Sequence, residues 1–210
     1  MVLLLATVPA VAAALGGWIS GGGSFFLLAV SLSVGCGLVV LLSRTPVEES
    51  LPAMGTLCFG TFYFAVPLAS LVEIHRMDPW LLMLTLAIVW LGDAAAFYAG
   101  RLLGKRKLAP VVSPNKTWVG AAASFLAALA VAGGWGLWRH GEIQPGLLVV
   151  AAFVSFMGQT GDLVNSMIKR GASVKDSGWL LPGHGGFYDR IDALLFGAPA
   201  MLLGLYWLGH

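Results

Sequence analysis

Long apolar runs, separated by turn residues and by charges, dominate the chain. Helices of about 20 apolar residues can cross the hydrocarbon core of a bilayer, which is about 30 Å thick. The pattern predicts seven such helices, at residues 2–18, 25–42, 53–72, 79–98, 117–138, 146–165 and 191–208. We therefore expect an all-α polytopic membrane protein, built as a bundle of about seven transmembrane helices.

The composition agrees with a membrane protein. Hydrophobic residues make up 58% of the chain and charged residues 10%, and the mean hydropathy is +0.86. Soluble domains usually carry about 25% charged residues. Cys36 and Cys58 fall inside predicted helices and are expected to be small core residues. The first apolar run lacks the basic start of a signal peptide, so we expect a retained helix there. The net charge of +2 does not indicate a nucleic-acid partner.

The basic residues predict an orientation. Nine of the 12 lie in the loops after the fourth and sixth predicted helices: Arg101, Lys105, Arg106, Lys107 and Lys116, then Lys169, Arg170, Lys175 and Arg190. Two helices separate these loops, so both lie on one side of the membrane. Loops rich in Lys and Arg face the cytoplasm. The N-terminus is then cytoplasmic and the C-terminus outside, and the charged loops form a cytoplasmic face.

Two acids interrupt apolar runs. Asp93 and Asp162 would each cost a few kcal/mol if they faced lipid. Such groups face a cavity, a cation or a partner, although an interhelical hydrogen bond or salt bridge explains each of them as well. The neighbourhood of Asp162 is polar, which favours a cavity: Gln159, Thr160, Asn165 and Ser166.

Three more acids lie near the predicted cytoplasmic side. Asp189 and Asp192 are three residues apart at the start of the last helix, so they share a helix face. Acids at a helix N-terminus also gain from the helix dipole, which is an alternative explanation for both. Asp176 lies in a loop close to Gly178, where the backbone could approach a ligand.

Together these acids and bases predict a site for a nucleotide and a phospholipid at the membrane face. Mg²⁺ binds through one or two carboxylates together with substrate phosphates, and basic residues bind polyphosphates. Zinc is disfavoured because His184 has no Cys or second His at ligand spacing. A hydrolase triad of Ser177, His184 and Asp189 lacks a nucleophile elbow. An ion transporter would spread its acids through the membrane depth, whereas these gather at one face.

A family resemblance covers the C-terminal half of the chain. Residues 166–192 read S-x-x-K-R-x4-K-D-x-G-x3-P-G-H-G-G-x2-D-R-x-D. This run closely resembles the signature of phosphatidate cytidylyltransferases, also called CDP-diacylglycerol synthases. Residues 93–104, D-x3-F-Y-x-G-R-x2-G, the run S-P-N-K-T at 113–117, and G-D-L at 161–163 resemble further motifs of that family.

The resemblance implies transfer of CMP from CTP to phosphatidate, giving CDP-diacylglycerol and pyrophosphate, with Mg²⁺ and an optional second cation. The implied catalytic residues are Asp176, Asp189, Lys175 and His184. The implied metal ligands are Asp176 and Asp189, with Asp162, Asp192 and Asp93 as further ligands or orienting groups. The implied phosphate-binding residues are Lys116, Lys169, Arg170, Lys175 and Arg190. Ser113 and Asn115 would contact the nucleotide, and Gly185 and Gly186 would let the backbone come close to a phosphate. His184 could equally fix its loop by a hydrogen bond.

The resemblance also divides the chain. Residues 1–78 would form an N-terminal scaffold on the lipid side, and residues 79–210 the catalytic half. A homodimer and a bacterial inner membrane are expectations of the same kind. Two departures matter: Val119 replaces the acid of the family's K-T-x-E-G motif, and fewer helices precede the signature than in many relatives. The alternatives are therefore a CTP-dependent enzyme for another lipid phosphate, such as an isoprenoid one, and a non-catalytic membrane relative.

Overall fold

The computed structural model describes residues 34–43, 46–174 and 188–209, and for residues 188–190 only the backbone. Contacts divide the chain into two compact units, Met1–Ser70 and Leu71–His210, and the boundary lies inside a long helix. The division into a scaffold of residues 1–78 and a catalytic half of residues 79–210 concerns function, and it stays a prediction.

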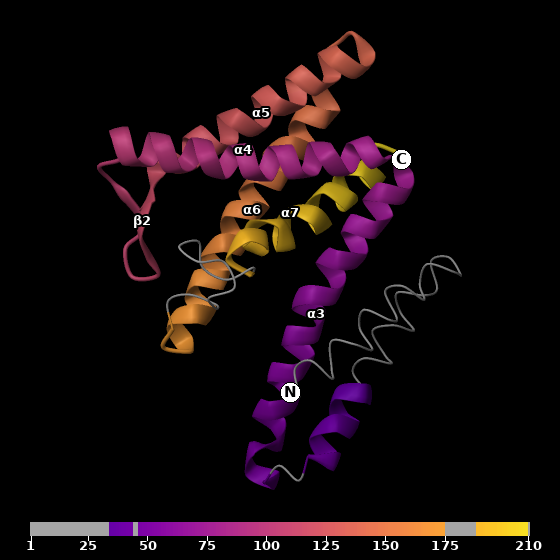
Figure 1. Cartoon of the computed structure of the whole chain (residues 1–210), viewed down its shortest axis with the longest axis vertical. Coiled ribbons are helices and arrows are strands. Elements are labelled where there is room, and N and C mark those ends of the chain that lie inside the picture. The colour runs from indigo at the N-terminus through magenta and orange to yellow at the C-terminus, as the bar shows by residue number, and fades with distance from the viewer. Residues whose placement is uncertain (1–33, 44–45, 175–187, 210) are drawn as a thin grey trace. The chain divides into compact units, whose positions relative to one another are not determined.

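The described part of the chain is mostly helical (Figure 1). The named helices are α3 (Val47–Met77), α4 (Pro79–Leu103), α5 (Trp118–His140), α6 (Pro145–Gly171) and α7 (Tyr188–Trp207). The first four of these are long and apolar enough to cross a membrane, and α7 contributes a shorter apolar stretch, Ile191–Trp207. Residues 34–42 are helical too, within the predicted run 25–42. The predicted run 2–18 lies outside the described residues, so the total of seven stays a prediction.

Local sequence signals set the helix ends. Asp78 caps α4 by accepting a hydrogen bond from the Trp80 backbone N–H at 2.9 Å, and Pro79 occupies the first turn, where its missing N–H is harmless. Thr117 caps α5 in the same way, through Gly120. Gly141, with φ of 75°, ends α5 in the left-handed conformation that glycine adopts without strain.

The second unit is built on two helix pairs. Helix α4 packs on α5, α6 packs on α7, and contacts between α5 and α6 join the pairs (Figure 1). The core contains Ile88, Ala128, Val154, Ala198 and Met201, each at most 1% exposed. Large apolar side chains also point outward along these helices, among them Leu126, Phe156 and Leu203, each more than 60% exposed. Such an apolar exterior suits a lipid environment.

Small residues let α4 and α5 approach each other closely. A Cβ added at Gly92 would lie 2.8 Å from the Ser124 hydroxyl, and one added at Gly120 would lie 2.8 Å from the Ala96 carbonyl oxygen. Real Cβ atoms do not come so near, so a side chain at Gly120 would collide with the backbone, and one at Gly92 would force the Ser124 side chain to move. Gly134, by contrast, has no such neighbour within 4 Å. Close contact through small residues is typical of membrane helices.

The first unit holds a smaller cluster of Cys36, Val40 and Leu57. Cys36 is buried, and its sulfur lies 3.7 Å from the Thr61 hydroxyl. Cys36 and Cys58 are both free thiols, and Cys58 is partly buried.

The segment between α4 and α5 departs from the purely helical expectation. It forms a hairpin of two antiparallel strands, β1 (Lys107–Ala109) and β2 (Ser113–Thr117), in which Lys107 pairs with Thr117 and Ala109 with Ser113. These short strands carry no alternation of apolar and polar residues, and Pro114 lies inside the second, so the pattern favoured a loop.

Candidate active site

A cavity of about 610 Å³ opens in the second unit, between α4, the hairpin, α5, α6 and the start of α7. Ligand pockets commonly measure about 300–1,000 Å³, so this one is large enough for a nucleotide or a lipid head group. Its walls are formed by Asp93, Ala96, Phe97, Gly100, Arg101, Gly104, Lys107, Leu108, Asn115, Lys116, Thr117, Gly120, Ala121, Gln159, Asp162 and Asp192.

Helix α4 contributes one continuous face to the cavity. Its lining residues lie at positions 93, 96, 97, 100 and 101, which is the spacing of residues on one side of a helix, and Gly104 just after the helix also lines the cavity. The acid Asp93 and the base Arg101 are separated along this face by two turns of small or aromatic residues. Gly100 brings the helix close to the hairpin, since a Cβ there would lie 2.9 Å from the Thr117 hydroxyl oxygen.

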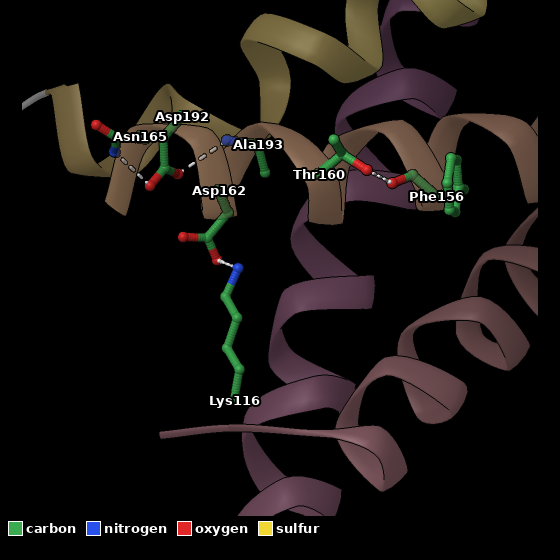
Figure 2. Close-up of polar contacts among 7 residues, drawn as sticks. All are labelled: Lys116, Phe156, Thr160, Asp162, Asn165, Asp192 and Ala193. Atoms are coloured by element: carbon green, nitrogen blue, oxygen red, sulfur yellow. Dashed lines mark hydrogen bonds and ion pairs between the residues drawn. The ribbon is translucent and has the colours of Figure 1, made fainter. Parts of the chain in front are cut away.

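The hairpin holds a lysine against α6. Lys116 precedes Thr117, whose hydroxyl caps α5 by accepting from the Gly120 N–H at 3.1 Å. The Trp118 N–H donates to the Arg106 carbonyl at 3.2 Å, which closes the base of the hairpin. From this fixed strand Lys116 reaches Asp162, with Nζ 2.6 Å from Oδ2 (Figure 2). The Lys116 and Asp162 side chains are 22% and 32% exposed, so the pair is partly shielded from solvent.

A buried amide orients the acid on α7. Asn165 is fully buried on α6, and its Nδ2 donates to Asp192 Oδ2 at 2.9 Å (Figure 2). The other Asp192 oxygen accepts from the Ala193 backbone N–H at 2.8 Å. Both carboxylate oxygens are thus held, which fixes the side chain between the two helices. Among the described residues, Asn165 Oδ1 has no hydrogen-bond partner.

A polar chain runs from the cavity wall into the interface of α5 and α6. Gln159 Nε2 donates to the Ala121 carbonyl and to the Ser155 hydroxyl, both at 3.3 Å. Ser155 lies 3.3 Å from Ser124, and both serines are buried. Buried polar groups need such partners, because an unpaired one costs free energy.

Charge is concentrated and mixed in the cavity. The carboxylates of Asp162 and Asp192 repel that of Asp93, and Lys116 attracts it. Arg101 and Lys107 add two further bases to the lining. In the part of the chain that the structure describes, no group of three or more His, Cys, Asp or Glu side chains is close enough to hold a metal ion by itself. A cation here would share its coordination with a ligand such as a phosphate, as Mg²⁺ commonly does.

Comparisons with known proteins place this chain in a family. The sequence model of the cytidylyltransferase family matches residues 1–208. The chain belongs to the cytidylyltransferase family. Curated family members named phosphatidate cytidylyltransferase are similar to it: one from Brucella suis is 41% identical over 181 residues, covering 83% of this chain and 63% of the relative. One from Bacillus subtilis is 38% identical over 159 residues, covering 73% of this chain and 59% of the relative. One from Haemophilus influenzae is 36% identical over 166 residues, covering 75% of this chain and 57% of the relative. The matches thus span about three fifths of these relatives' length.

Five of the residues predicted for the site of this chain line the cavity: Asp93, Asn115, Lys116, Asp162 and Asp192. They come from four separate elements, and the fold brings them together.

Other predicted residues lie elsewhere. Ser113 begins β2 and does not line the cavity. Lys169 and Arg170 lie in the last turn of α6, and the charge of Lys169 acts on Asp192. The backbone of Asp189 and Arg190 opens α7, but their side chains lie outside the described set. Lys175, Asp176, His184, Gly185 and Gly186 lie outside the described residues altogether. The roles of all these residues stay predictions.

Sequence reasoning missed four polar residues. Arg101 and Lys107 line the cavity, although the basic segment around Lys107 was interpreted as a topology signal. Arg101 could have been found from its helical spacing to Asp93. Gln159 and Asn165 were noted only as polar neighbours of Asp162. Their partners on other helices, Ala121 and Asp192, lie 38 and 27 residues away in the chain, and no local signal points to them.

Proposed function

We propose that this chain transfers CMP from CTP to phosphatidate, giving CDP-diacylglycerol and pyrophosphate. The observation that carries the proposal is the cavity, in which three carboxylates and three bases meet within a member of the cytidylyltransferase family. The relatives named phosphatidate cytidylyltransferase support the same reaction. Because the matches span about three fifths of those relatives, the activity is a proposal for this chain.

The reaction brings two anions together. An oxygen of the phosphatidate phosphate attacks the α-phosphorus of CTP and forms a new P–O bond. The bond from the α-phosphorus to the bridging oxygen of the β-phosphate breaks, and its electron pair leaves with pyrophosphate. Lys116, Arg101 and Lys107 are the described bases that could hold these phosphates and offset the charge on the leaving group.

The carboxylates suit a divalent cation. Asp93, Asp162 and Asp192 offer hard oxygen ligands, and substrate phosphates would complete the coordination, which fits Mg²⁺ better than a site built from protein ligands alone. When bound, Mg²⁺ supplies positive charge that neutralises phosphate oxygens during displacement. Asp162 would exchange its contact with Lys116 for this ligand role, and Asn165 would keep Asp192 oriented. Asp176 and Asp189 complete the proposed set of ligands.

We also propose that the chain is an integral protein of a bacterial inner membrane, with about seven spans and the cavity facing the cytoplasm. The four long apolar helices and the bacterial relatives support the membrane location. The basic residues at the cavity end of α4 and in the last turn of α6 support the orientation. A homodimer stays an expectation of the family resemblance.

A transfer assay tests the proposal. The chain is purified in detergent and supplied with phosphatidate, labelled CTP and Mg²⁺. We expect labelled CDP-lipid and released pyrophosphate, both lost with EDTA and in Asp176→Asn. Product with an isoprenoid phosphate in place of phosphatidate would assign the enzyme to the other acceptor. A folded chain that binds no CTP and forms no product would be a non-catalytic relative.

A further inference from the structure

Gln159 lies where a ligand in the cavity would meet it. It is three residues before Asp162 on α6, so the two side chains share one helix face, and both line the cavity. Gln159 has no place in the reaction derived above, which needs bases and carboxylates at the phosphates. A neutral amide at this position calls for a different explanation.

The surrounding contacts fix which end of the Gln159 amide is the nitrogen and which is the oxygen. The Ala121 carbonyl oxygen can only accept a hydrogen bond, so the nitrogen end of Gln159 must point toward it. The second N–H is directed at the Ser155 hydroxyl, whose own hydrogen is then available to Ser124. Both donors of the amide are therefore used. Its Oε1 is left as an acceptor, and no described residue donates to it.

The chemistry of the substrates selects what this acceptor can bind. Ionised phosphates carry only acceptors, so they would be repelled by Oε1 and belong beside the bases. The ester groups of phosphatidate have no N–H or O–H donor either. Donors are found on the nucleoside: the exocyclic amino group of cytosine and the hydroxyls of the ribose. Gln159 contacts Ala121, and the same cavity is also lined by Ala96 and Phe97; none of these three side chains carries a polar atom, which suits a flat base better than a ribose.

We infer that Gln159 is a specificity residue that accepts a hydrogen bond from the 4-amino group of the cytosine base. The inference rests on the proposed function and deepens it. Uracil carries an oxygen at this position, which would place two acceptors against each other. A site built around such a hydrogen bond rejects an analogue that lacks the donor, because the acceptor is then left unpaired in the complex.

The test combines changes in protein and ligand. Wild type, Gln159→Met and a control, Thr160→Val, are assayed for binding and transfer of CTP, UTP, dCTP and the triphosphate of a pyrimidinone that lacks the amino group. Thr160 is the matched control because its hydroxyl donates to Phe156 of its own helix at 2.9 Å and does not line the cavity (Figure 2).

Loss of the amino group should weaken nucleotide binding to wild type and to Thr160→Val by about tenfold or more. The same loss should change nucleotide binding to Gln159→Met by less than about twofold. An equal loss in wild type and Gln159→Met would overturn the inference while leaving the proposed function intact. The inference would also be overturned if Gln159→Met abolished the discrimination between CTP and dCTP instead, since Gln159 would then bind the ribose hydroxyl and not the base. If Gln159→Met does not fold, wild type alone tests the inference. Binding of the pyrimidinone triphosphate and of UTP as tight as binding of CTP would refute it. Wild type that binds no cytidine nucleotide would refute the proposed function, and the inference with it.

Discussion

The ion pair between Lys116 and Asp162 links the hairpin to α6, and removing it should cost measurable stability. The 2.6 Å separation is short, but the two side chains are 22% and 32% exposed. Exposed pairs contribute about 0.2–1 kcal/mol, whereas breaking a fully buried pair costs about 3–5 kcal/mol. For Lys116→Met we therefore expect a loss of about 1–2 kcal/mol. This corresponds to a fall in the midpoint of thermal unfolding of about 2–8 °C.

The assay is thermal unfolding in detergent without divalent cations. Arg139→Met is the matched control, because Arg139 pairs with Asp78 at a longer 3.6 Å and is 47% exposed. It should lose less than about 1 kcal/mol. The double variant Lys116→Met/Asp162→Asn should recover part of the loss, since no unpaired carboxylate remains. Equal shifts of the unfolding midpoint in Lys116→Met and Arg139→Met would refute the reasoning. So would a loss of stability in the double variant that equals the sum of the losses in Lys116→Met and Asp162→Asn.

The same variant separates the ion pair from the proposed metal role. Without Lys116, Asp162 is free to bind a cation, so Mg²⁺ with CTP should stabilise Lys116→Met more than the double variant against unfolding. Equal stabilisation of the two variants would argue that Asp162 is not a ligand.

The remaining predictions concern packing, orientation and the departure from the family motif. Gly92→Ala should destabilise the protein by about 1–3 kcal/mol, because the new methyl would meet Ser124, whereas Gly134→Ala should not, as thermal unfolding of both would reveal. Asn165→Leu should lower turnover with little change in CTP binding, because Asp192 loses its orienting donor; unchanged turnover would contradict this role. Val119→Glu should keep or raise transfer activity, since Val119 is exposed in the first turn of α5, where the helix dipole favours an acid; a clear loss would mean that the site depends on valine.

The apolar pattern was enough to predict the long helices, and the reasons are local. Helices α4 and α5 begin within one residue of their predicted starts, because Asp78 with Pro79 and Thr117 are readable caps. Helix α6 continues to Gly171, past its predicted end at residue 165, since polar residues extend a helix without lengthening its apolar run. Lys169 and Arg170 in its last turn also complement the helix dipole.

The sequence predicted those site residues whose charge would be costly in free energy inside an apolar helix. Asp93 and Asp162 stood out because charged groups inside apolar helices need a reason, and both line the cavity. The hydrogen-bond partners of Gln159 and Asn165 could not be predicted, because they depend on how α5, α6 and α7 pack. The hairpin that presents Lys116 also gave no periodic signal.

The most direct test of the account is turnover by two matched acid variants. Asp162→Asn changes a carboxylate in the cavity, and Asp78→Asn changes one that caps α4 outside it, where asparagine caps equally well. With labelled CTP, phosphatidate and Mg²⁺, Asp162→Asn should lose at least about 100-fold in transfer rate, and Asp78→Asn should stay near wild type. Near-normal transfer by folded Asp162→Asn would contradict the claim that this cavity is where cytidylyl transfer takes place.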